Sequence, residues 1–254
     1  MLFDLETMTP AIVLGGRPYV QAFSETFRSP LTVTPYGPIT GERQWIAHTP
    51  WYGDFGSAAF ANPVGNFPFA YGPNGLTITM TETNGVWQSG LLSSVDPAGN
   101  GFSQAMGYFE CRMQMPAGPG VWPAFWLRSS ADPNAYGELD VVEYYGEAAG
   151  HAFSTTLHVW PKATGAQQQY WQQNVLNLPV DLTAGFHLYG IEITDTDTIV
   201  YLDRAPVFSA PTQPCWKVPM GILINLALGG GWPIDQTPNP SVLAVDYVKT
   251  FVRA

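Results

Sequence analysis

Three carboxylates, Glu138, Asp140 and Glu143, lie within six residues of the strand-like segment GELDVVEYYGE, residues 137–147. Side chains two apart on a strand share a face, so Glu138 and Asp140 point the same way, whereas Glu143 would point to the opposite face. One extra residue in the strand, a β-bulge at Val141–Val142, would bring Glu143 back beside the other two. The spacing therefore predicts a bulged strand with all three carboxylates on one face.

Carboxylates grouped in this way can perform acid–base and nucleophilic chemistry. Three of them in one groove of low dielectric cannot all stay ionised, so at least one keeps a proton near neutral pH. A pair with split protonation supplies a nucleophile and a general acid, as in glycosidases, where a separation of about 5–5.5 Å accompanies retention and about 6.5–9.5 Å inversion. The spacing alone leaves two alternatives, a solvated strand face and a calcium site.

The elements that must position these side chains are short strands. The chain has 254 residues, 46% of them apolar, with 26 Gly and 23 Pro spread along its length. Period-two runs bounded by turn residues recur, for example GLTITMTET (75–83), and TDTD (194–197) predicts a hairpin turn between two such runs. We expect an all-β fold of two packed antiparallel sheets. Residues 1–20 are interpreted as an N-terminal arm or linker remnant, and 21–254 as a single domain.

Charge and aromatic content narrow the partners. The formal net charge is −10 with only 10 Lys plus Arg and no basic cluster, so we expect no nucleic-acid partner. No uninterrupted apolar run approaches the ~18 residues that would span a bilayer, so we expect no membrane partner. Nine Trp, 12 Tyr and 14 Phe exceed what a core needs and suit stacking on uncharged sugar rings. Cys111 and Cys215 leave open one disulfide or two buried thiols, and alternation favours a reduced core residue for Cys111.

Several motifs together resemble glycoside hydrolase family 16, the laminarinase and lichenase group. GELDVVEYYG resembles the bulged E-x-D-x-x-E active-site strand of that family's laminarinase-like members. Three further segments resemble the family in the same order: GYFECRMQMPAGPGVWPAFWL (107–127), LINLALGGGWP (223–233) and VDYVKTF (245–251). The family's usual hairpin is also similar, with two departures: Ile193 stands where the family often has Trp, and Arg204 where it often has Gly. The resemblance covers residues 20–254.

This resemblance implies a fold and a mechanism. The fold would be a concanavalin-like β-jelly-roll sandwich with an open substrate cleft, and residues 21–254 would be its catalytic domain. Glu138 would be the nucleophile and Glu143 the acid/base of a retaining endo-glycosidase, with Asp140 hydrogen-bonded to the nucleophile. No cofactor is implied for catalysis.

The resemblance also implies substrate-binding residues. Glu110 and Arg112 resemble positions that bind sugar hydroxyls at glycone subsites, with a cross-strand ion pair as the alternative. Trp122 and Trp126 would form a stacking wall near the cleavage point. His158 would be a groove histidine that contacts substrate or a catalytic carboxylate, with a histidine bound only to backbone as the alternative. Trp232 would cap one end of the cleft.

A structural calcium is the metal that the family often carries. Asp246 in the last strand fits the position of its carboxylate ligand, with Glu25 assisting through its backbone. An ordinary exposed aspartate is the alternative.

The function expected is an endo-β-glucanase that hydrolyses internal β-1,3 or mixed β-1,3/1,4 bonds of a polysaccharide. The alternatives are a bacterial exopolysaccharide glycanase of the same family, a succinoglycan-type depolymerase, and a non-catalytic glycan-binding module on the same fold. We expect a monomer that acts outside the cell. Because the N-terminus has no secretory-signal pattern, this location requires a removed leader, a longer parent chain or non-classical export.

Overall fold

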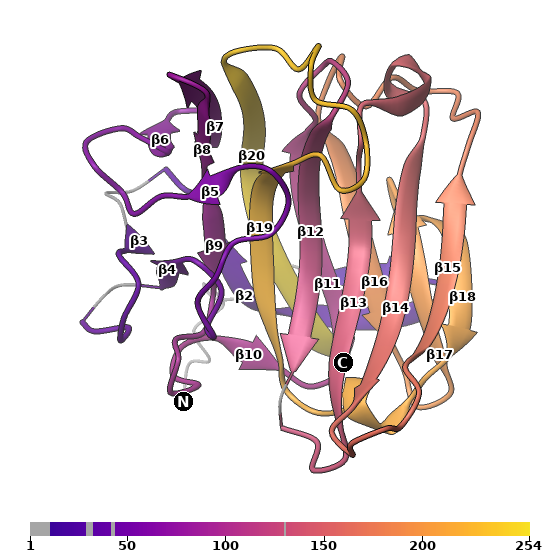
Figure 1. The fold of residues 1–254 in the computed structure, drawn as a ribbon. Helices are drawn as coiled ribbons and strands as arrows, with labels where there is room; N and C mark the ends of the chain where they lie inside the picture. Colours follow the sequence, from indigo (N-terminus) through magenta and orange to yellow (C-terminus); the bar gives the residue numbers. More distant parts are fainter. Residues whose placement is uncertain (1–10, 29–32, 42–43, 130) are drawn as a thin grey trace, which may run out of the picture.

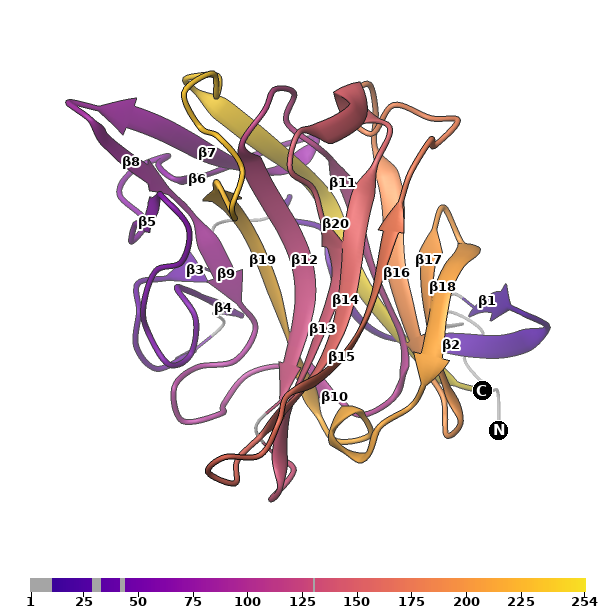
Figure 2. The ribbon, with the colours of Figure 1, turned by 45° about the vertical axis from the view of Figure 1, so that its right-hand side comes forward.

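Two β-sheets packed face to face make up the molecule (Figures 1 and 2). The computed structural model describes residues 11–28, 33–41, 44–129 and 131–254. No helix in these ranges is both long and apolar enough to cross a membrane. Short 3-10 turns, η1 (Glu147–Gly150) and η2 (Pro214–Trp216), interrupt the strands. The predicted all-β architecture is confirmed.

One sheet, which we call the inner sheet, carries the cleft that is described below. Its strand order is β15-β14-β13-β12-β19-β9-β4-β3, with β10 paired to β19. The bounds are β3 (Val33–Thr34), β4 (Trp45–Ala47), β9 (Leu91–Ser93), β10 (Ser103–Gln104), β12 (Val121–Ser129), β13 (Ala135–Glu143), β14 (Phe153–Pro161), β15 (Gln169–Val175) and β19 (Met220–Leu228).

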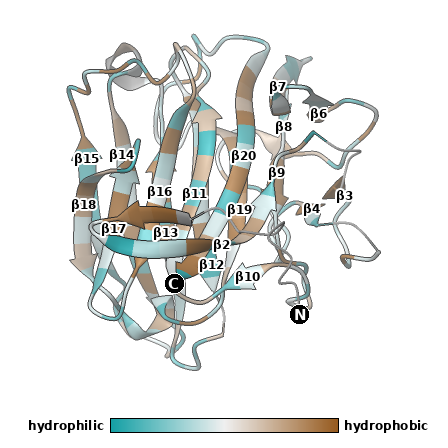
Figure 3. Cartoon of the chain, turned by 180° about the vertical axis from the view of Figure 1, so that it is seen from behind, coloured by the Kyte–Doolittle hydropathy of each residue, from teal (hydrophilic) through white to brown (hydrophobic). Residues whose placement is uncertain are grey.

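The second sheet, the outer sheet, has the order β18-β17-β16-β11-β20-β7-β8-β5, with β2 on β20, β1 on β2 and β6 on β7. Seen from behind, hydrophobic and hydrophilic bands alternate along its strands (Figure 3). The bounds are β1 (Ala11–Leu14), β2 (Arg17–Glu25), β5 (Ala59–Phe60), β6 (Phe69–Gly72), β7 (Gly75–Thr83), β8 (Val86–Ser89), β11 (Gly107–Gln114), β16 (His187–Ile193), β17 (Asp197–Leu202), β18 (Ala205–Pro211) and β20 (Ser241–Arg253).

The core lies between the two sheets because each strand turns alternate apolar side chains inward. On β11, Phe109, Cys111 and Met113 are fully buried in this layer, as alternation predicts. Both cysteines are free and buried, which settles the open alternative in favour of two thiols. Pairing is antiparallel as expected, except for the short parallel pairs β3–β4 and β5–β8.

The N-terminal boundary differs from the prediction. Residues 11–25 form the hairpin β1–β2, whose turn is Gly15–Gly16 with positive φ at both residues. Strand β2 pairs with β20 from Tyr19 to Glu25, so it extends the outer sheet. The assignment of residues 11–20 to an arm is therefore wrong, and residues 1–10 lie outside the described ranges. The hairpin predicted at TDTD is confirmed as the β16–β17 turn.

Candidate active site

The predicted bulge is present in β13. Against β12, Asp140 pairs with Trp126 and Val142 with Phe125, so Val141 has no opposite residue. Against β14, three steps along β13 from Asp140 to Glu143 match only two steps from Thr156 to Ser154. Val141 and Val142 both bury their side chains completely. The extra residue restores parity, so Glu143 reaches the same face as Glu138 and Asp140.

That face opens into a cleft of about 280 Å³ on the inner sheet. All three carboxylates line it together with aromatic and polar side chains from β12, β14, β19 and the loop 49–56. Its lining residues are Trp51, Phe55, Trp122, Ala124, Trp126, Glu138, Asp140, Glu143, His158 and Asn225.

Glu138 is paired with Arg128, which lies opposite it on β12: the guanidinium Nη1 donates to Glu138 Oε2. The Arg128 guanidinium also lies 5.3 Å from the ring centroid of Trp51 and 5.0 Å from that of Tyr136. Cation–π contacts of this kind limit the rotamers of a long side chain. Arg128 therefore holds the Glu138 carboxylate in one place and balances its negative charge.

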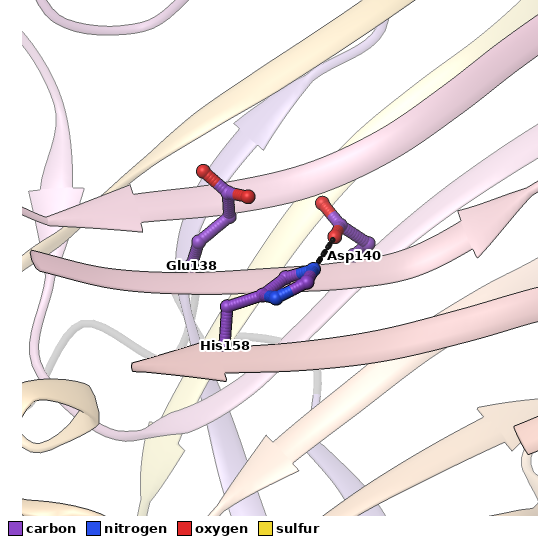
Figure 4. A group of neighbouring side chains, drawn as sticks. All are labelled: Glu138, Asp140 and His158. Carbon is purple, nitrogen blue, oxygen red and sulfur yellow. Dashed lines mark ion pairs between the residues drawn. The ribbon is translucent and has the colours of Figure 1, made fainter. Parts of the chain in front are cut away.

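Asp140 and His158 form the second part of the cluster (Figure 4). His158 Nε2 lies 3.2 Å from Asp140 Oδ2, and the amide nitrogen of Gln168 lies 2.6 Å from His158 Nδ1. With Gln168 donating to Nδ1, the ring proton is on Nε2 and points at Asp140. Burial lowers the pKa of His158, so the ring is neutral at pH 7. Burial, with the charges of Glu143 and Glu138, raises the pKa of Asp140 well above its usual range.

Glu143 is held by neutral donors. The Tyr145 hydroxyl donates to Glu143 Oε1 at 2.8 Å, and Trp122 Nε1–H donates to the same oxygen at 3.1 Å. Burial raises the pKa of Glu143, the charge of Glu138 adds to this, and the two hydrogen bonds oppose it. Glu143 is thus suited to keep a proton at a higher pH than an ordinary glutamate, as a general acid must.

Two of the three tryptophans predicted for the cleft line it, and Trp232 lines a neighbouring pocket. Trp122 and Trp126 both line it, and Trp126 Nε1–H donates to Asn225 Oδ1 at 2.8 Å. Trp232 lies beyond Trp122 with 45% of its surface exposed, and its ring centroid is 6.0 Å from that of Tyr145. His158 contacts a carboxylate of the cluster, as expected, rather than only backbone.

Glu110 and Arg112 are not in the cleft. Both lie on β11 of the outer sheet, where Glu110 is fully buried and accepts hydrogen bonds from Arg204 at 2.9 and 3.0 Å. Arg112 donates to Asp246 at 2.7 Å. The prediction that the two residues bind sugar at a glycone subsite is wrong. The alternative of a cross-strand ion pair is confirmed, because Arg112 pairs with Asp246 on the neighbouring strand β20 and Glu110 pairs with Arg204. Arg204, one of the departures from the family pattern, is the residue that neutralises Glu110.

The surroundings of Asp246 do not fit calcium. One carboxylate oxygen accepts from Arg28 and the other from Arg112. Two guanidiniums occupy the lone pairs that a cation would need and would repel it. The Glu25 side chain accepts the backbone N–H of Phe27 at 2.6 Å. Asp246 is thus the ion-pair partner of Arg28 and Arg112, and the residues around it do not fit the predicted calcium ligand set.

Within the described ranges, one group has metal-ligand geometry: Glu138, Asp140 and His158 offer ligand atoms within 4.8 Å of one another. The Arg128 guanidinium already occupies Glu138, so a cation there would compete with a resident positive charge. The group is better explained by the carboxylate chemistry above.

Arg128, Tyr145 and Asn225 are among the residues of this site that sequence reasoning missed. Arg128 was accessible to it, because alternation from Trp122 through Trp126 puts position 128 on the cleft face. Asn225 was visible as the one polar side chain in the apolar run MGILINLALGG. Tyr145 follows the end of β13, where alternation no longer predicts a direction.

Aromatic walls around a partly buried pair of carboxylates are typical of enzymes that cleave glycosidic bonds. Residues 56–249 match the family model for glycosyl hydrolases family 16. The chain belongs to this family.

Two curated relatives come from Rhizobium meliloti. The chain is 35% identical over 222 residues to endo-1,3-1,4-beta-glycanase ExsH, covering 83% of this chain and 43% of that protein. It is 36% identical over 195 residues to endo-1,3-1,4-beta-glycanase EglC, covering 72% of this chain and 39% of that protein. The chain therefore spans about two fifths of the length of these relatives.

Solved structures show the same fold. The endo-beta-1,3-glucanase of Pyrococcus furiosus superposes with a TM-score of 0.70 at 22% identity, over 96% of this chain and 99% of the other. The laminarinase catalytic domain of Thermotoga maritima superposes with a TM-score of 0.69 at 18% identity, over 93% and 99%. The jelly-roll fold predicted from the motifs is confirmed.

Proposed function

We propose that this chain is a retaining endo-β-glycanase that hydrolyses internal β-1,3 or mixed β-1,3/1,4 bonds of a polysaccharide. The observation that carries the proposal is the bulge in β13, which brings Glu138 and Glu143 to one face of an aromatic cleft in different electrostatic surroundings. Glu138 is paired with a cation, and Glu143 is buried among neutral donors. This difference in surroundings matches the roles of a nucleophile, Glu138, and a general acid, Glu143.

The reaction proceeds in two displacements. The Glu138 carboxylate attacks the anomeric carbon, the bond from that carbon to the glycosidic oxygen breaks, and Glu143 gives its proton to the departing oxygen. Glu143 then takes a proton from water, whose oxygen attacks the anomeric carbon and releases Glu138. The sugar leaves with its original anomeric configuration.

Asp140 and Arg128 divide the task of controlling Glu138. Arg128 balances the negative charge of the nucleophile before attack. Asp140 lies close to Glu138, and its raised pKa allows it to remain protonated as negative charge builds up nearby. The expectation that Asp140 hydrogen-bonds the nucleophile stays a proposal, because the recorded partner of Glu138 is Arg128.

A bacterial exopolysaccharide is the second candidate substrate. It is favoured by the similarity to the two Rhizobium meliloti glycanases, which exceeds that to the β-glucanase of Rhodothermus marinus at 28% identity. A polymer of either kind is met outside the cell, so we propose an extracellular enzyme, and an open cleft within one chain supports action as a monomer.

The test is a release assay on laminarin, mixed-linkage β-glucan and succinoglycan-type exopolysaccharide. We expect reducing ends from internal cleavage of at least one polymer, with the β-anomer seen first by NMR. Glu138→Gln should lower the rate at least ~100-fold. Binding without any release by the intact chain would instead identify a glycan-binding module, and α-anomer formation would contradict retention.

A further inference from the structure

Tyr145 connects the acid/base to an aromatic surface outside the cleft. It lies two residues after Glu143, where β13 has ended, and its hydroxyl donates to Glu143 Oε1 at 2.8 Å. The neighbouring Tyr144 turns the other way and is buried in the core. The chain therefore directs only the second tyrosine of the YYG sequence to the catalytic face.

Both donors to Glu143 bind the same oxygen. Tyr145 and Trp122 each donate to Oε1. Within the described ranges, no hydrogen bond to Oε2 is seen. A protonated carboxyl group carries one O–H, and an oxygen that already accepts two hydrogen bonds is the poorer place for it. The proton of Glu143 is thereby directed to Oε2.

The ring of Tyr145 continues a row of aromatic side chains. Its centroid lies 5.7 Å from that of Trp122 and 6.0 Å from that of Trp232, with interplanar angles of 34° and 31°. Next to it is a pocket of about 220 Å³ that Tyr145, Trp232 and the loops 119–120 and 233–236 line. This pocket adjoins the acid/base, not the nucleophile.

Gly230 fixes these rings in place. A β-carbon at this position would lie 2.7 Å from the Tyr145 ring and 2.9 Å from the Trp122 ring. Only a residue without a side chain lets the loop pack this closely on both rings. The glycine-rich loop that presents Trp232 is thus also the support of the two donors to Glu143.

We propose that Tyr145 is a positioning residue that couples binding of the departing sugar chain to the proton of Glu143. Its hydroxyl holds Oε1, so that the proton on Oε2 faces the glycosidic oxygen. Its ring forms, with Trp232, the wall of a subsite for an uncharged pyranose of the departing chain. Stacking on this wall orders the ring and with it the hydroxyl. The inference rests on the proposed function and assigns the leaving-group side of that same cleft.

The charged and titratable groups that face Glu143 determine how its titration is interpreted. Glu138 and Asp140 come from the same strand, Arg128 from β12 and His158 from β14. Tyr145→Phe changes none of these and removes one hydrogen bond.

The first experiment compares Tyr145→Phe with the intact protein on two substrates, the polysaccharide and a dinitrophenyl β-glycoside, whose leaving group departs without a proton. We expect kcat/KM on the polysaccharide to fall about tenfold, because Glu143 becomes a carboxylate as it gives up its proton and the variant lacks one hydrogen bond to that charge. The value of kcat/KM on the aryl glycoside should change far less. The basic limb of the polysaccharide profile should move to higher pH, because Tyr145 lowers the pKa of Glu143. Tyr144→Phe is the matched control and should leave the limb in place. Equal losses on both substrates with an unmoved limb would overturn the positioning role.

A second measurement does not depend on turnover. In protein with ¹³C-labelled glutamate side chains, the carboxyl signal of Glu143, identified by its absence in Glu143→Gln, should titrate at higher pH in Tyr145→Phe than in the intact chain. If the carboxyl signal of Glu143 titrates at the same pH in Tyr145→Phe and in the intact chain, the proposal that Tyr145 holds the Glu143 carboxyl is overturned. If the intact chain cleaves no glycan, the proposed function fails, whereas this titration still reports on Tyr145.

The subsite is tested with Trp232→Ala. It should raise KM for the polysaccharide several-fold and leave the basic limb where it is, since Trp232 does not touch Glu143. An unchanged KM, or a limb that moves as in Tyr145→Phe, would overturn the assignment of the pocket to the departing chain.

Discussion

At the scale of single residues, the two glutamates differ in what holds them. Glu138 faces the guanidinium of Arg128, whereas Glu143 accepts hydrogen bonds from an indole and a phenol. A positive charge favours the ionised form of its partner, and burial beside neutral donors favours the protonated form. The two glutamates thus differ in their surroundings, as the mechanism needs: one cation faces Glu138, and uncharged donors hold Glu143.

Arg128→Gln should move the acid limb of the activity profile to higher pH. The positive charge of Arg128 lowers the pKa of Asp140 against the larger effect of burial, and it pairs with Glu138. Without it, Asp140 keeps its proton at higher pH, and the nucleophile Glu138 loses the cation that balances its charge. We expect about tenfold lower kcat/KM on the acid side of the optimum. Rates measured from pH 4 to 9 check this; Arg128→Lys keeps the charge and should stay near the original limb. If Arg128→Gln and the intact chain had the same acid limb, the charge of Arg128 would have no role in setting that limb.

At the scale of elements, the bulge in β13 decides which way Glu143 points. The two residues of the bulge, Val141 and Val142, both pack into the core. A regular strand would put the carboxyl of residue 143 among them, where an unpaired charge is strongly unfavourable.

Insertion of one alanine after Val142 should therefore abolish activity and lower stability together. The added residue moves Glu143 by one step and turns it toward the core, with a loss of activity at least as large as that of Glu143→Gln, and a lower melting temperature. Val142→Ala keeps the bulge and is the control: it should cost about 2 kcal/mol through its cavity but retain activity. A folded insertion variant with normal turnover would show that the bulge does not decide the direction of Glu143.

The hairpin β1–β2 is tied to the outer sheet by a buried carboxylate. Glu192 accepts hydrogen bonds from Arg17 Nε at 2.7 Å, from Tyr201 at 2.7 Å, and from Tyr19. Burial alone would raise the pKa of Glu192, but these bonds outweigh it and lower the pKa below the ordinary 4.5. A lowered pKa stabilises the fold above pH 4.5, and this contribution disappears as the pH falls through the folded-state value.

Glu192→Gln should accordingly destabilise the protein at pH 7 by about 2 kcal/mol, less than a fully enclosed pair because Arg17 is partly exposed. The difference from the intact chain should shrink below pH 4.5. Urea unfolding at pH 7 and pH 4 measures it, with the exposed Asp195→Asn as control. If the loss of unfolding free energy in Glu192→Gln were the same at both pH values, the charged pair could not be its cause.

At the scale of the whole molecule, the two sheets have separate tasks. The inner sheet carries the cleft, and the outer sheet holds the ion pairs Arg204–Glu110 and Arg17–Glu192, whose carboxylates are buried, as part of the framework. Asp246, which the family resemblance implied for calcium, belongs to this framework through Arg28 and Arg112.

The melting temperature should therefore not depend on calcium. We expect EDTA or millimolar Ca²⁺ to shift it by less than about 1 °C, since only a ligand that binds the native state raises stability. Asp246→Asn should lower it equally in both buffers. A drop of several degrees with EDTA, absent in Asp246→Asn, would restore the calcium site.

Sequence alone determined the strand character, the bulge and the grouping of the three carboxylates, because each depends on neighbours within a few residues. Alternation also put Glu110 and Arg112 correctly on one face of their strand. It could not say that this face lies outside the sandwich, because their partners Arg204 and Asp246 are 94 and 134 residues away in the chain. Tertiary structure decided those pairings, the sheet membership of residues 11–20, and the donors that distinguish Glu138 from Glu143. Local periodicity specifies the side of a strand, and only packing specifies what lies against that side.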